Sequence, residues 1–430
     1  MKLFTYQERG VQWLRSRQFG MLADEMGLGK TVQALTAARL TKSKRITVLC
    51  PAAVTHMWER KAEEVFGRST RVYSFNKAEE AHDLSYLGVL IVDEWHYLKN
   101  PEANRTNVVL GKGGLIHHCD RAWALSGTPM PNHPGELWSW MYVTGATNMS
   151  YEKWVQTFCT MGRFKKIRGA RKLAIPQLRK LLSGHILRRL QRTVMKDLPP
   201  VRIDTLNIKT ARVNPAELDY WFPSIFLNGQ SVADFDARIA EETETLKKAL
   251  ATGDPGELEL IAEHLATLHK YFGMLKMPGI GKLLVEELEQ KLYSKIVVFA
   301  MHRNVLFGLR DYLKLHGVKS VMMFGGSTKR EKVIDDFIND RRVAVFLGQI
   351  NAAGTGVDGL QEVCHNVLLA ERAWSPSVND QAIARLARIG QKNPVNVRIA
   401  AAEGTLDEAL AGVLKRKTED TQEIMKGVED

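Results

Sequence analysis

Several features that would assign this chain of 430 residues to a class are missing from it. Its four cysteines, Cys50, Cys119, Cys159 and Cys364, are widely spaced and form no C-x-x-C pair, which argues against a disulfide framework or a structural zinc site. No apolar run approaches the length of a membrane span, and the N-terminus lacks the apolar core of a signal peptide. We therefore expect a soluble intracellular protein that does not enter membranes.

Acidic residues are missing from one long segment. Residues 153–196 contain thirteen Lys or Arg and no Asp or Glu, which leaves about −1 for the rest of a chain whose net charge is +12. A solvated basic face explains most charge runs, but forty-four residues without one acid exceed what solubility requires. We interpret this segment as the contact surface for a polyanion, with a solvated face as the alternative.

The apolar runs of the chain form two separate α/β patterns. In the first 145 residues, strands are predicted at residues 20–23, 46–50, 89–92 and 122–125. A second set is predicted at residues 296–300, 343–347, 367–370 and 395–400. Between them, residues 151–190 read as basic helices, residues 202–208 as one strand, and residues 214–290 as helices with an acidic bias. The pattern predicts two α/β lobes joined by a helical middle.

A glycine-rich turn follows the first predicted strand. Residues 24–31 read DEMGLGKT and lead into a predicted helix. Backbone N–H groups at such a turn bind polyphosphates; we expect Lys30 to reach the β- and γ-phosphates and the Thr31 hydroxyl to ligate Mg²⁺. Asp24 stands where the general phosphate-loop pattern has its first glycine. The turn predicts ATP or GTP binding, with an ordinary glycine turn beside an exposed lysine as the alternative.

Acidic and hydroxyl side chains follow two later strands. Asp93 and Glu94 come directly after the strand at residues 87–92. Because ligands of open α/β sheets bind at the carboxyl ends of strands, these carboxylates can share a site with the phosphate loop. Asp93 is then the Mg²⁺ ligand, and Glu94 positions and deprotonates the attacking water. Ser126 and Thr128, after the next strand, can hydrogen-bond a neighbouring carboxylate, although for this motif taken alone a plain turn is the better explanation.

Residues 381–391, QAIARLARIGQ, combine buried and charged character. Gln381, Arg385 and Arg388 are spaced to share one face of a predicted helix, and every other position through Ile389 is Ala, Ile or Leu. We expect a helix buried nearly all round. Two arginines without an acid within a turn on their face need an anion, and we predict a triphosphate. Salt bridges to distant acids are the alternative.

Together these motifs resemble the SNF2 family of superfamily 2 helicase-like ATPases, which translocate on double-stranded nucleic acid. The resemblance covers nearly the whole chain, and Asp24 fits the phosphate loop of that family. The Q motif is matched by Tyr6-Gln7, motif Ia by residues 50–58, motif II by 93–96, motif III by 125–131, motif V by 352–356 and motif VI by 381–391. Ala370-Glu371 and residues 350–354 favour the branch that contains annealing helicases.

The sequence departs from the family pattern at three positions. Trp95 stands where motif II has a small residue, Ser375 where asparagine is usual, and Ala387 where histidine is common. None of these departures removes a catalytic group. The ATPase prediction therefore stands.

The resemblance implies an α/β fold of two RecA-like lobes, each a parallel sheet flanked by helices, with helical insertions between them. Lobe 1 would bind ATP with residues 1–150. A basic helical protrusion and crossover would occupy residues 151–200, and a helical middle or second protrusion residues 201–290. Lobe 2 would follow at residues 291–430.

It also implies roles for individual residues. Catalysis is assigned to Lys30, Glu94, Arg385 and Arg388. ATP binding is assigned to Gln7, Gly27, Gly29, Lys30, Thr31 and Gln381, and Mg²⁺ binding to Thr31 and Asp93. Coupling is assigned to His96, Ser126, Thr128, Thr355 and Gly356, and DNA contact to Lys165, Lys166, Arg168, Arg171 and Lys172.

The implied function is DNA-stimulated ATP hydrolysis that drives translocation on double-stranded DNA and remodels DNA or protein–DNA complexes. Forked or branched DNA is included among the expected partners, and the chain is expected to act as a monomer. Its location would be the cytoplasm or nucleoid of a prokaryote or phage host, or the nucleus of a eukaryote. A strand-separating DNA or RNA helicase and a nucleotide-dependent DNA clamp are the competing hypotheses.

Overall fold

The structure is a computed structural model that describes residues 2–43, 45–67, 70–81, 86–162, 167–211, 231–252, 262–353, 357–402, 405–426 and 428. Two compact units make up the chain. Unit 1 consists of Met1–Met161, Lys165–Asp197 and Lys417–Asp430, and unit 2 of Gly162–Phe164 and Leu198–Arg416.

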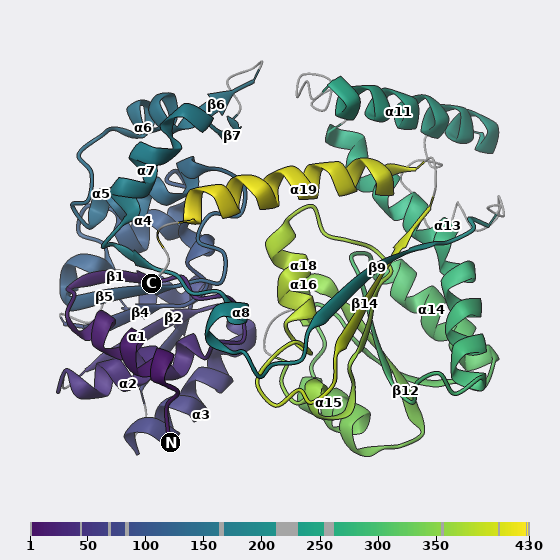
Figure 1. The fold of residues 1–430 in the computed structure, drawn as a ribbon, viewed down its shortest axis with the longest axis horizontal. Helices are drawn as coiled ribbons and strands as arrows, with labels where there is room; N and C mark the ends of the chain where they lie inside the picture. Colours follow the sequence, from purple (N-terminus) through teal and green to yellow (C-terminus); the bar gives the residue numbers. More distant parts are fainter. Residues whose placement is uncertain are drawn as a thin grey trace. The chain divides into compact units, whose positions relative to one another are not determined.

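Unit 1 is built on a six-stranded sheet in the order β3-β2-β4-β5-β1-β8, with every neighbouring pair parallel (Figure 1). Its strands are β1 (Phe19–Leu22), β2 (Ile46–Cys50), β3 (Arg71–Ser74), β4 (Gly88–Val92), β5 (Cys119–Leu125) and β8 (Ile186–Leu187). Its helices are α1 (Thr5–Arg15), α2 (Lys30–Leu40), α3 (Thr55–Phe66), α4 (Asn104–Leu110), α5 (Trp138–Val143), α6 (Tyr151–Phe158), α7 (Ile175–Leu182) and α8 (Gln191–Val194). The hairpin β6 (Cys159–Met161) and β7 (Ile167–Ala170) is antiparallel.

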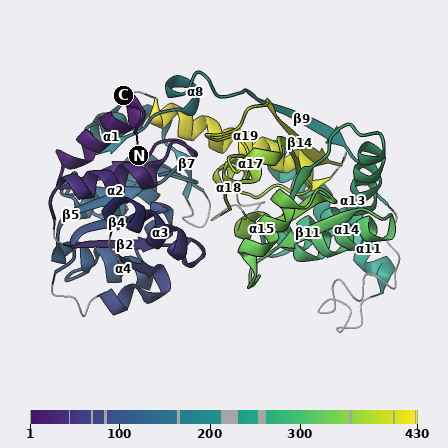
Figure 2. The ribbon, with the colours of Figure 1, turned by 90° about the horizontal axis from the view of Figure 1, so that it is seen from below.

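The sheet of unit 1 is covered on both faces because its strands are apolar at successive positions. Val48 belongs to a core with α1, α2 and α3, whereas the next residue, Leu49, belongs to a core with α4 to α7. Side chains of adjacent strand residues point to opposite faces, so a continuous apolar strand serves both cores. Figure 2 shows α1 and α2 side by side in this unit.

Unit 2 repeats this plan with a six-stranded parallel sheet in the order β11-β12-β10-β13-β14-β9. Its strands are β9 (Val201–Asn207), β10 (Ile296–Ala300), β11 (Lys319–Met323), β12 (Val343–Gln349), β13 (Asn366–Leu369) and β14 (Val395–Ala401). Its helices are α11 (Val232–Thr252), α13 (Ala262–Glu289), α14 (Arg303–Leu315), α15 (Arg330–Asn339), α16 (Ile350–Ala353), α17 (Leu360–Val363) and α18 (Pro376–Ile383). Helix α19 (Leu406–Met425) begins in unit 2, and its residues from Lys417 belong to unit 1.

The predicted fold class, two parallel α/β lobes, is confirmed. All nine predicted strands are present, two of them with the predicted bounds, β2 and β10. The prediction of helices throughout residues 151–190 is wrong in part, since β6, β7 and β8 lie within that segment. Edge strands β3 and β11 were also missed, because their short sequences are partly exposed and mix polar with apolar residues. Among the described residues, we find no helix with the length and hydropathy of a membrane span.

Candidate nucleotide-binding site

The phosphate loop of unit 1 joins the end of β1 to the start of α2. Gly27 and Gly29 have φ angles of +80° and +73°, in the left-handed region that favours glycine. The ammonium group of Lys30 donates to the carbonyls of Asp24 at 2.8 Å and Glu25 at 3.2 Å, so it lies folded over its own loop. Its own loop therefore holds the lysine in this structure, and its contact with nucleotide phosphates stays a prediction.

Burial and nearby carboxylates act in opposite directions on the pKa of Lys30. Burial lowers its pKa, and the nearby carboxylates of Glu94, Asp24 and Asp93 oppose that shift. Because the carboxylates of Asp93 and Glu94 act on the pKa of Lys30, the residues after β4 lie near the phosphate loop. It agrees with the sheet order, in which only β5 separates β4 from β1.

Asp24 has a structural role that its position in the loop did not reveal. Its carboxylate is fully buried and accepts two hydrogen bonds from Arg189, at 2.9 Å from Nε and 2.6 Å from Nη2. Gln33 of α2 donates to the same carboxylate at 3.1 Å. Arg189 follows closely on β8 and is 4% exposed. The loop is therefore fastened to the strand at the edge of the sheet.

Asp93 and Glu94 lie at the carboxyl end of β4, as predicted. The Trp58 indole of α3 donates to Asp93 Oδ2 at 2.8 Å, and the backbone N–H of Glu94 donates to Oδ1 at 3.0 Å. Burial and the adjacent Glu94 raise the pKa of Asp93 to about 6, while the Trp58 hydrogen bond opposes this shift. Trp58 thus holds a side chain that sequence reasoning assigned to Mg²⁺. The sequence signal for it was the match of residues 50–58 to motif Ia.

Glu94 has an unusual backbone conformation. Its φ angle of +51° lies in the left-handed region, which costs a non-glycine residue about 1–2 kcal/mol. Its Oε2 lies 3.3 Å from His96 Nδ1. Strained residues concentrate at functional sites, and this one is the predicted general base. Trp95, between the two, is fully buried against Trp140, so its indole packs into the core.

Motif III lies at the end of β5 beside the phosphate loop. Ser126 Oγ is buried and accepts from the N–H of Thr128 at 3.1 Å, a bond within the motif rather than to a carboxylate. A Cβ added at Gly127 would lie 3.6 Å from Lys30 Nζ and 2.7 Å from the Met26 side chain. Motif III therefore packs directly on the loop, and the coupling role of Ser126, Thr128 and His96 stays a prediction.

Gln7 of α1 also contacts the phosphate loop. Its amide donates to the carbonyl of Leu28 at 3.3 Å, and the Tyr6 hydroxyl donates to the same carbonyl at 3.3 Å. A Cβ at Gly29 would lie 2.5 Å from Gln7 Nε2, so the Gln7 side chain fits against the loop only because residue 29 is a glycine. Gln7 thus has a structural contact with the loop, and its role in ATP binding stays a prediction.

In unit 2, the predicted helix over residues 381–389 is confirmed only at residues 381–383 and is wrong beyond them. Helix α18 ends at Ile383, and the chain continues in hydrogen-bonded turns. The Gln391 amide donates to the carbonyl of Leu386 at 3.3 Å and to that of Cys364 at 3.0 Å, which holds the end of these turns against the segment before β13. Ile389 is 36% exposed, so the segment is not buried all round either.

Both arginines of this segment have protein partners. Arg388 forms an ion pair with Asp358, whose carboxylate is supplied from thirty residues away, and Arg385 donates to the carbonyl of Val357 at 3.3 Å. For Arg388, this structure therefore shows the alternative stated above, a salt bridge to an acid distant in sequence. Gln381 is 7% exposed on α18. Thr355 and Gly356 lie outside the described residues.

The basic segment divides into internal and exposed charges. Arg188 and Arg189 are buried, and Arg188 donates to the carbonyls of Ala23 and Gly127, both at 3.3 Å. The exposed members among the described residues are Lys153, Arg171, Lys172, Lys180, Arg192 and Lys196. Lys165, Lys166 and the side chain of Arg168 lie outside the described part of the chain. Arg188 and Arg189 therefore belong to the core of unit 1 and are not available to a polyanion. Polyanion contact by the other basic residues of the segment stays a prediction.

Two family models match this chain, one mainly over unit 1 and the other within unit 2. Residues 6–83 and 70–215 match the SNF2-related domain, and residues 280–390 match the helicase conserved C-terminal domain. The solved helicase domain of Pyrococcus furiosus Hef has a TM-score of 0.52 and 16% identity, covering 95% of this chain and 97% of that one. That likeness shows a shared fold.

Curated relatives align along almost the whole chain. The SWI/SNF-related matrix-associated actin-dependent regulator of chromatin subfamily A-like protein 1 homolog of Caenorhabditis elegans is 27% identical over 97% of this chain and 61% of its own length. DNA annealing helicase and endonuclease ZRANB3 of Bos taurus is 27% identical over 99% of this chain and 41% of its own length. The chain thus spans less than two thirds of these relatives. With both domain matches in order and most of the sequence covered, it belongs to the SNF2 family of helicase-like ATPases.

Proposed function

We propose that this chain is a DNA-stimulated ATPase that translocates on double-stranded DNA and thereby remodels DNA or protein–DNA complexes. The observation that carries the proposal is the convergence of Lys30, Asp93 and Glu94 at one edge of the unit 1 sheet. A phosphate-binding lysine, an Mg²⁺ ligand and a general base are the groups that ATP hydrolysis requires.

The residues of unit 1 fit Mg²⁺ and a triphosphate. The N-terminus of α2 provides backbone donors, and Lys30 is bound to loop carbonyls that a phosphate would displace. Thr31 and Asp93 would hold Mg²⁺, which would neutralise charge on the β- and γ-phosphates. Glu94 would accept the proton of the attacking water, and Trp58 would keep Asp93 oriented.

Arg385 and Arg388 are proposed to stabilise the charge that develops on the γ-phosphate. This role rests on their chemistry and on the family pattern of motif VI. Arg388 is 24% exposed at its side chain and its partner Asp358 is 52% exposed, so the pair is partly solvated and can be exchanged at small cost. A switch of partner would let nucleotide state govern the position of this arginine.

Duplex DNA is the proposed polymer partner. Support comes from the exposed basic residues of unit 1 and from the ZRANB3 relative, which is named a DNA annealing helicase and endonuclease. Contacts to phosphates should make binding tolerant of sequence and sensitive to salt. Forked or branched DNA and action as a monomer belong to the same proposal.

Three assays separate translocation from its alternatives. Triplex displacement reports translocation along a duplex, fork unwinding reports strand separation, and ATP turnover on duplex, single-stranded, forked and RNA substrates identifies the activating polymer. We expect triplex displacement and duplex-stimulated turnover, both abolished in Lys30→Ala. Efficient unwinding of a long plain duplex would favour a helicase, and ATP-dependent binding with negligible turnover would favour a clamp.

The DNA surface can be tested separately through salt dependence. Changing Lys153, Arg171, Lys172 and Lys180 to alanine should reduce the slope of log affinity against log salt by about 0.9 for each DNA phosphate that the variant no longer neutralises. The matched control changes four exposed basic residues elsewhere on unit 1, Lys2, Arg9, Arg60 and Lys112. Equal slopes in both variants and the unmodified chain would mean that the basic segment faces solvent.

A further inference from the structure

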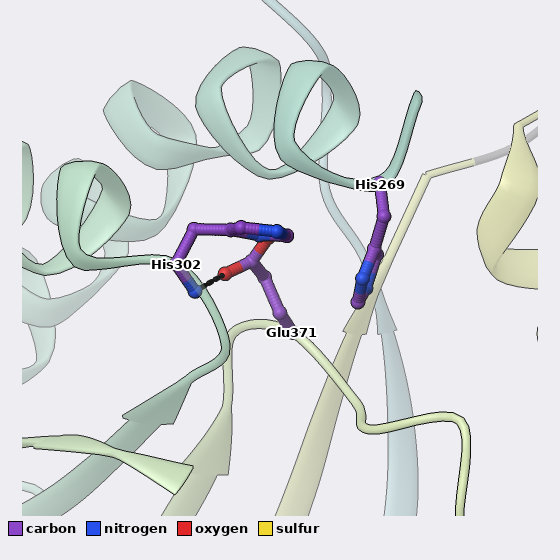
Figure 3. Close-up of side chains that lie close together, drawn as sticks. All are labelled: His269, His302 and Glu371. Atoms are coloured by element: carbon purple, nitrogen blue, oxygen red, sulfur yellow. Dashed lines mark hydrogen bonds and ion pairs between the residues drawn. The ribbon is translucent and has the colours of Figure 1, made fainter. Parts of the chain in front are cut away.

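Three side chains of the kinds that ligate metals meet in unit 2. One donor atom each from His269, His302 and Glu371 lies within 4.8 Å of the other two. His269 comes from α13, His302 precedes the first turn of α14, and Glu371 follows β13 (Figure 3). Nothing in the proposed ATPase mechanism uses this cluster.

The fold brings these side chains together from three elements. Strands β10 and β13 are parallel neighbours, so the segments after their carboxyl ends, which carry His302 and Glu371, start side by side. Helix α13 packs against α14 and supplies His269. Gly273, one turn after His269, leaves room for the carboxylate, because a Cβ there would lie 2.2 Å from Glu371 Oε1. The helix can approach the carboxylate this closely only with glycine at that position.

Glu371 is held rigidly. Its Oε2 accepts from the backbone N–H groups of Met301 at 3.0 Å and His302 at 2.9 Å, and its Oε1 lies 2.8 Å from His302 Nδ1. The residue is 1% exposed. Backbone donors on one oxygen fix the carboxylate, while the other oxygen stays directed at the histidines. This is the arrangement of a ligand oriented by its surroundings.

The buried imidazole of His269 is incompletely hydrogen-bonded. Its imidazole is 2% exposed, and Nε2 has no hydrogen-bond partner among the described residues. Leaving a buried polar nitrogen unpaired costs about 1–3 kcal/mol. The ring of His302 lies 5.2 Å away, centroid to centroid.

We propose that His269, His302 and Glu371 bind a divalent transition cation, with Zn²⁺ as the best chemical match. Two imidazoles and one carboxylate, with water in a further position, are a ligand set that Zn²⁺ uses. Tetrahedral ligands about 2.0–2.2 Å from Zn²⁺ lie about 3.3–3.6 Å from one another, so side-chain rotations that draw together donor atoms now within 4.8 Å would complete the site. Mg²⁺ prefers oxygen ligands in octahedral geometry and fits poorly. The bound cation would tie α13 to two strand ends and stabilise unit 2.

The test uses the whole chain, stripped with a chelator and titrated with Zn²⁺ in excess Mg²⁺ and without nucleotide. We expect one tightly bound Zn²⁺ per chain, a rise in the unfolding temperature, and a Co²⁺ visible spectrum without thiolate bands. His269→Gln, which keeps similar size and helix propensity, should weaken Zn²⁺ binding by at least about 10–100-fold, the range for removing an outer-shell partner of a metal site. His302→Ala should do the same.

His316→Ala is the matched control, since His316 is an exposed histidine of the same unit. It should bind Zn²⁺ as the unmodified chain does. The proposal is overturned if the unmodified chain binds no more Zn²⁺ than His269→Gln, provided that circular dichroism shows both folded. It is equally overturned if the Co²⁺ spectrum shows thiolate ligation or if His316→Ala removes the bound ion. The ATPase prediction for Lys30→Ala is independent of either result.

Discussion

The two units use ion pairs near their predicted functional residues in opposite ways. In unit 1, Asp24 and Arg189 are 0% and 4% exposed at their side chains and share two hydrogen bonds. In unit 2, Arg388 and Asp358 are 24% and 52% exposed. A buried pair is costly to break, whereas a partly solvated pair is worth little. Unit 1 thus holds a fixed loop, and unit 2 carries an arginine whose partner can change.

The largest expected effect comes from Arg388→Ala. ATP turnover should fall by about 10³–10⁵, the measured worth of arginine fingers, because the variant has no guanidinium to stabilise the developing phosphate charge. ATP affinity should stay nearly unchanged. Both are measured by steady-state turnover on duplex DNA and by equilibrium binding of labelled ATP.

Asp358→Asn sharpens that result, since it removes the protein partner of Arg388 and keeps the arginine. We expect turnover close to that of the unmodified chain. If Asp358→Asn loses as much activity as Arg388→Ala, the arginine acts by holding unit 2 together and the proposed role is wrong.

Glu94→Gln should reduce turnover by about 10²–10⁴, the contribution of a general base, while ATP still binds. The amide preserves the size of the side chain but cannot take a proton from water. Single-turnover hydrolysis measures the step directly, and Glu102→Gln, at an exposed glutamate of the same unit, serves as control. Rapid hydrolysis by Glu94→Gln would exclude this residue as the base.

Arg189→Met tests the buried ion pair of unit 1. It leaves the buried Asp24 carboxylate without its cation and should lower the free energy of unfolding by about 3–5 kcal/mol, measured by urea denaturation. The double variant Asp24→Asn with Arg189→Met should recover part of this loss. Arg388→Met in unit 2 should cost no more than about 1 kcal/mol, and equal costs for both arginines would refute the contrast between the units.

The smallest predicted effect is that of Trp58→Phe. Without the indole N–H, Asp93 loses an orienting hydrogen bond, and the Mg²⁺ concentration for half-maximal turnover should rise by about 10–100-fold. Trp138→Phe loses an indole hydrogen bond to the Met149 carbonyl instead and should leave the Mg²⁺ requirement unchanged. Matching shifts in both variants would point to general destabilisation.

Strands inside each sheet were predictable because burial on both faces requires apolar residues at every position. Ile46–Cys50 and Ile296–Ala300 are buried at every position, so their apolar runs mark them unambiguously. Edge strand Arg71–Ser74 has exposed and polar residues and gives no such signal. The hydrogen bonds that place it come from β2, which local sequence cannot reveal.

The candidate site was predictable where a motif is contiguous. Lys30, Asp93 and Glu94 follow strands closely, and the sheet gathers them at one edge. The partners of these motifs come from distant sequence: Arg189 for Asp24 and Asp358 for Arg388. Spacing also predicted a helix through Arg388, but α18 ends at Ile383, and the turns that follow place Arg388 beside Asp358, a partner that lies thirty residues earlier in the chain.

The bond between Asp24 and Arg189 has a mechanical consequence. Arg189 lies between β8 and α8, just before the segment that leaves unit 1 for unit 2. The guanidinium therefore joins the chain that approaches this linker to the phosphate loop, and the Gln191 N–H, which donates to Glu25, adds a second connection. Asp24, where the general phosphate-loop pattern has glycine, thus provides a side-chain attachment that glycine could not make.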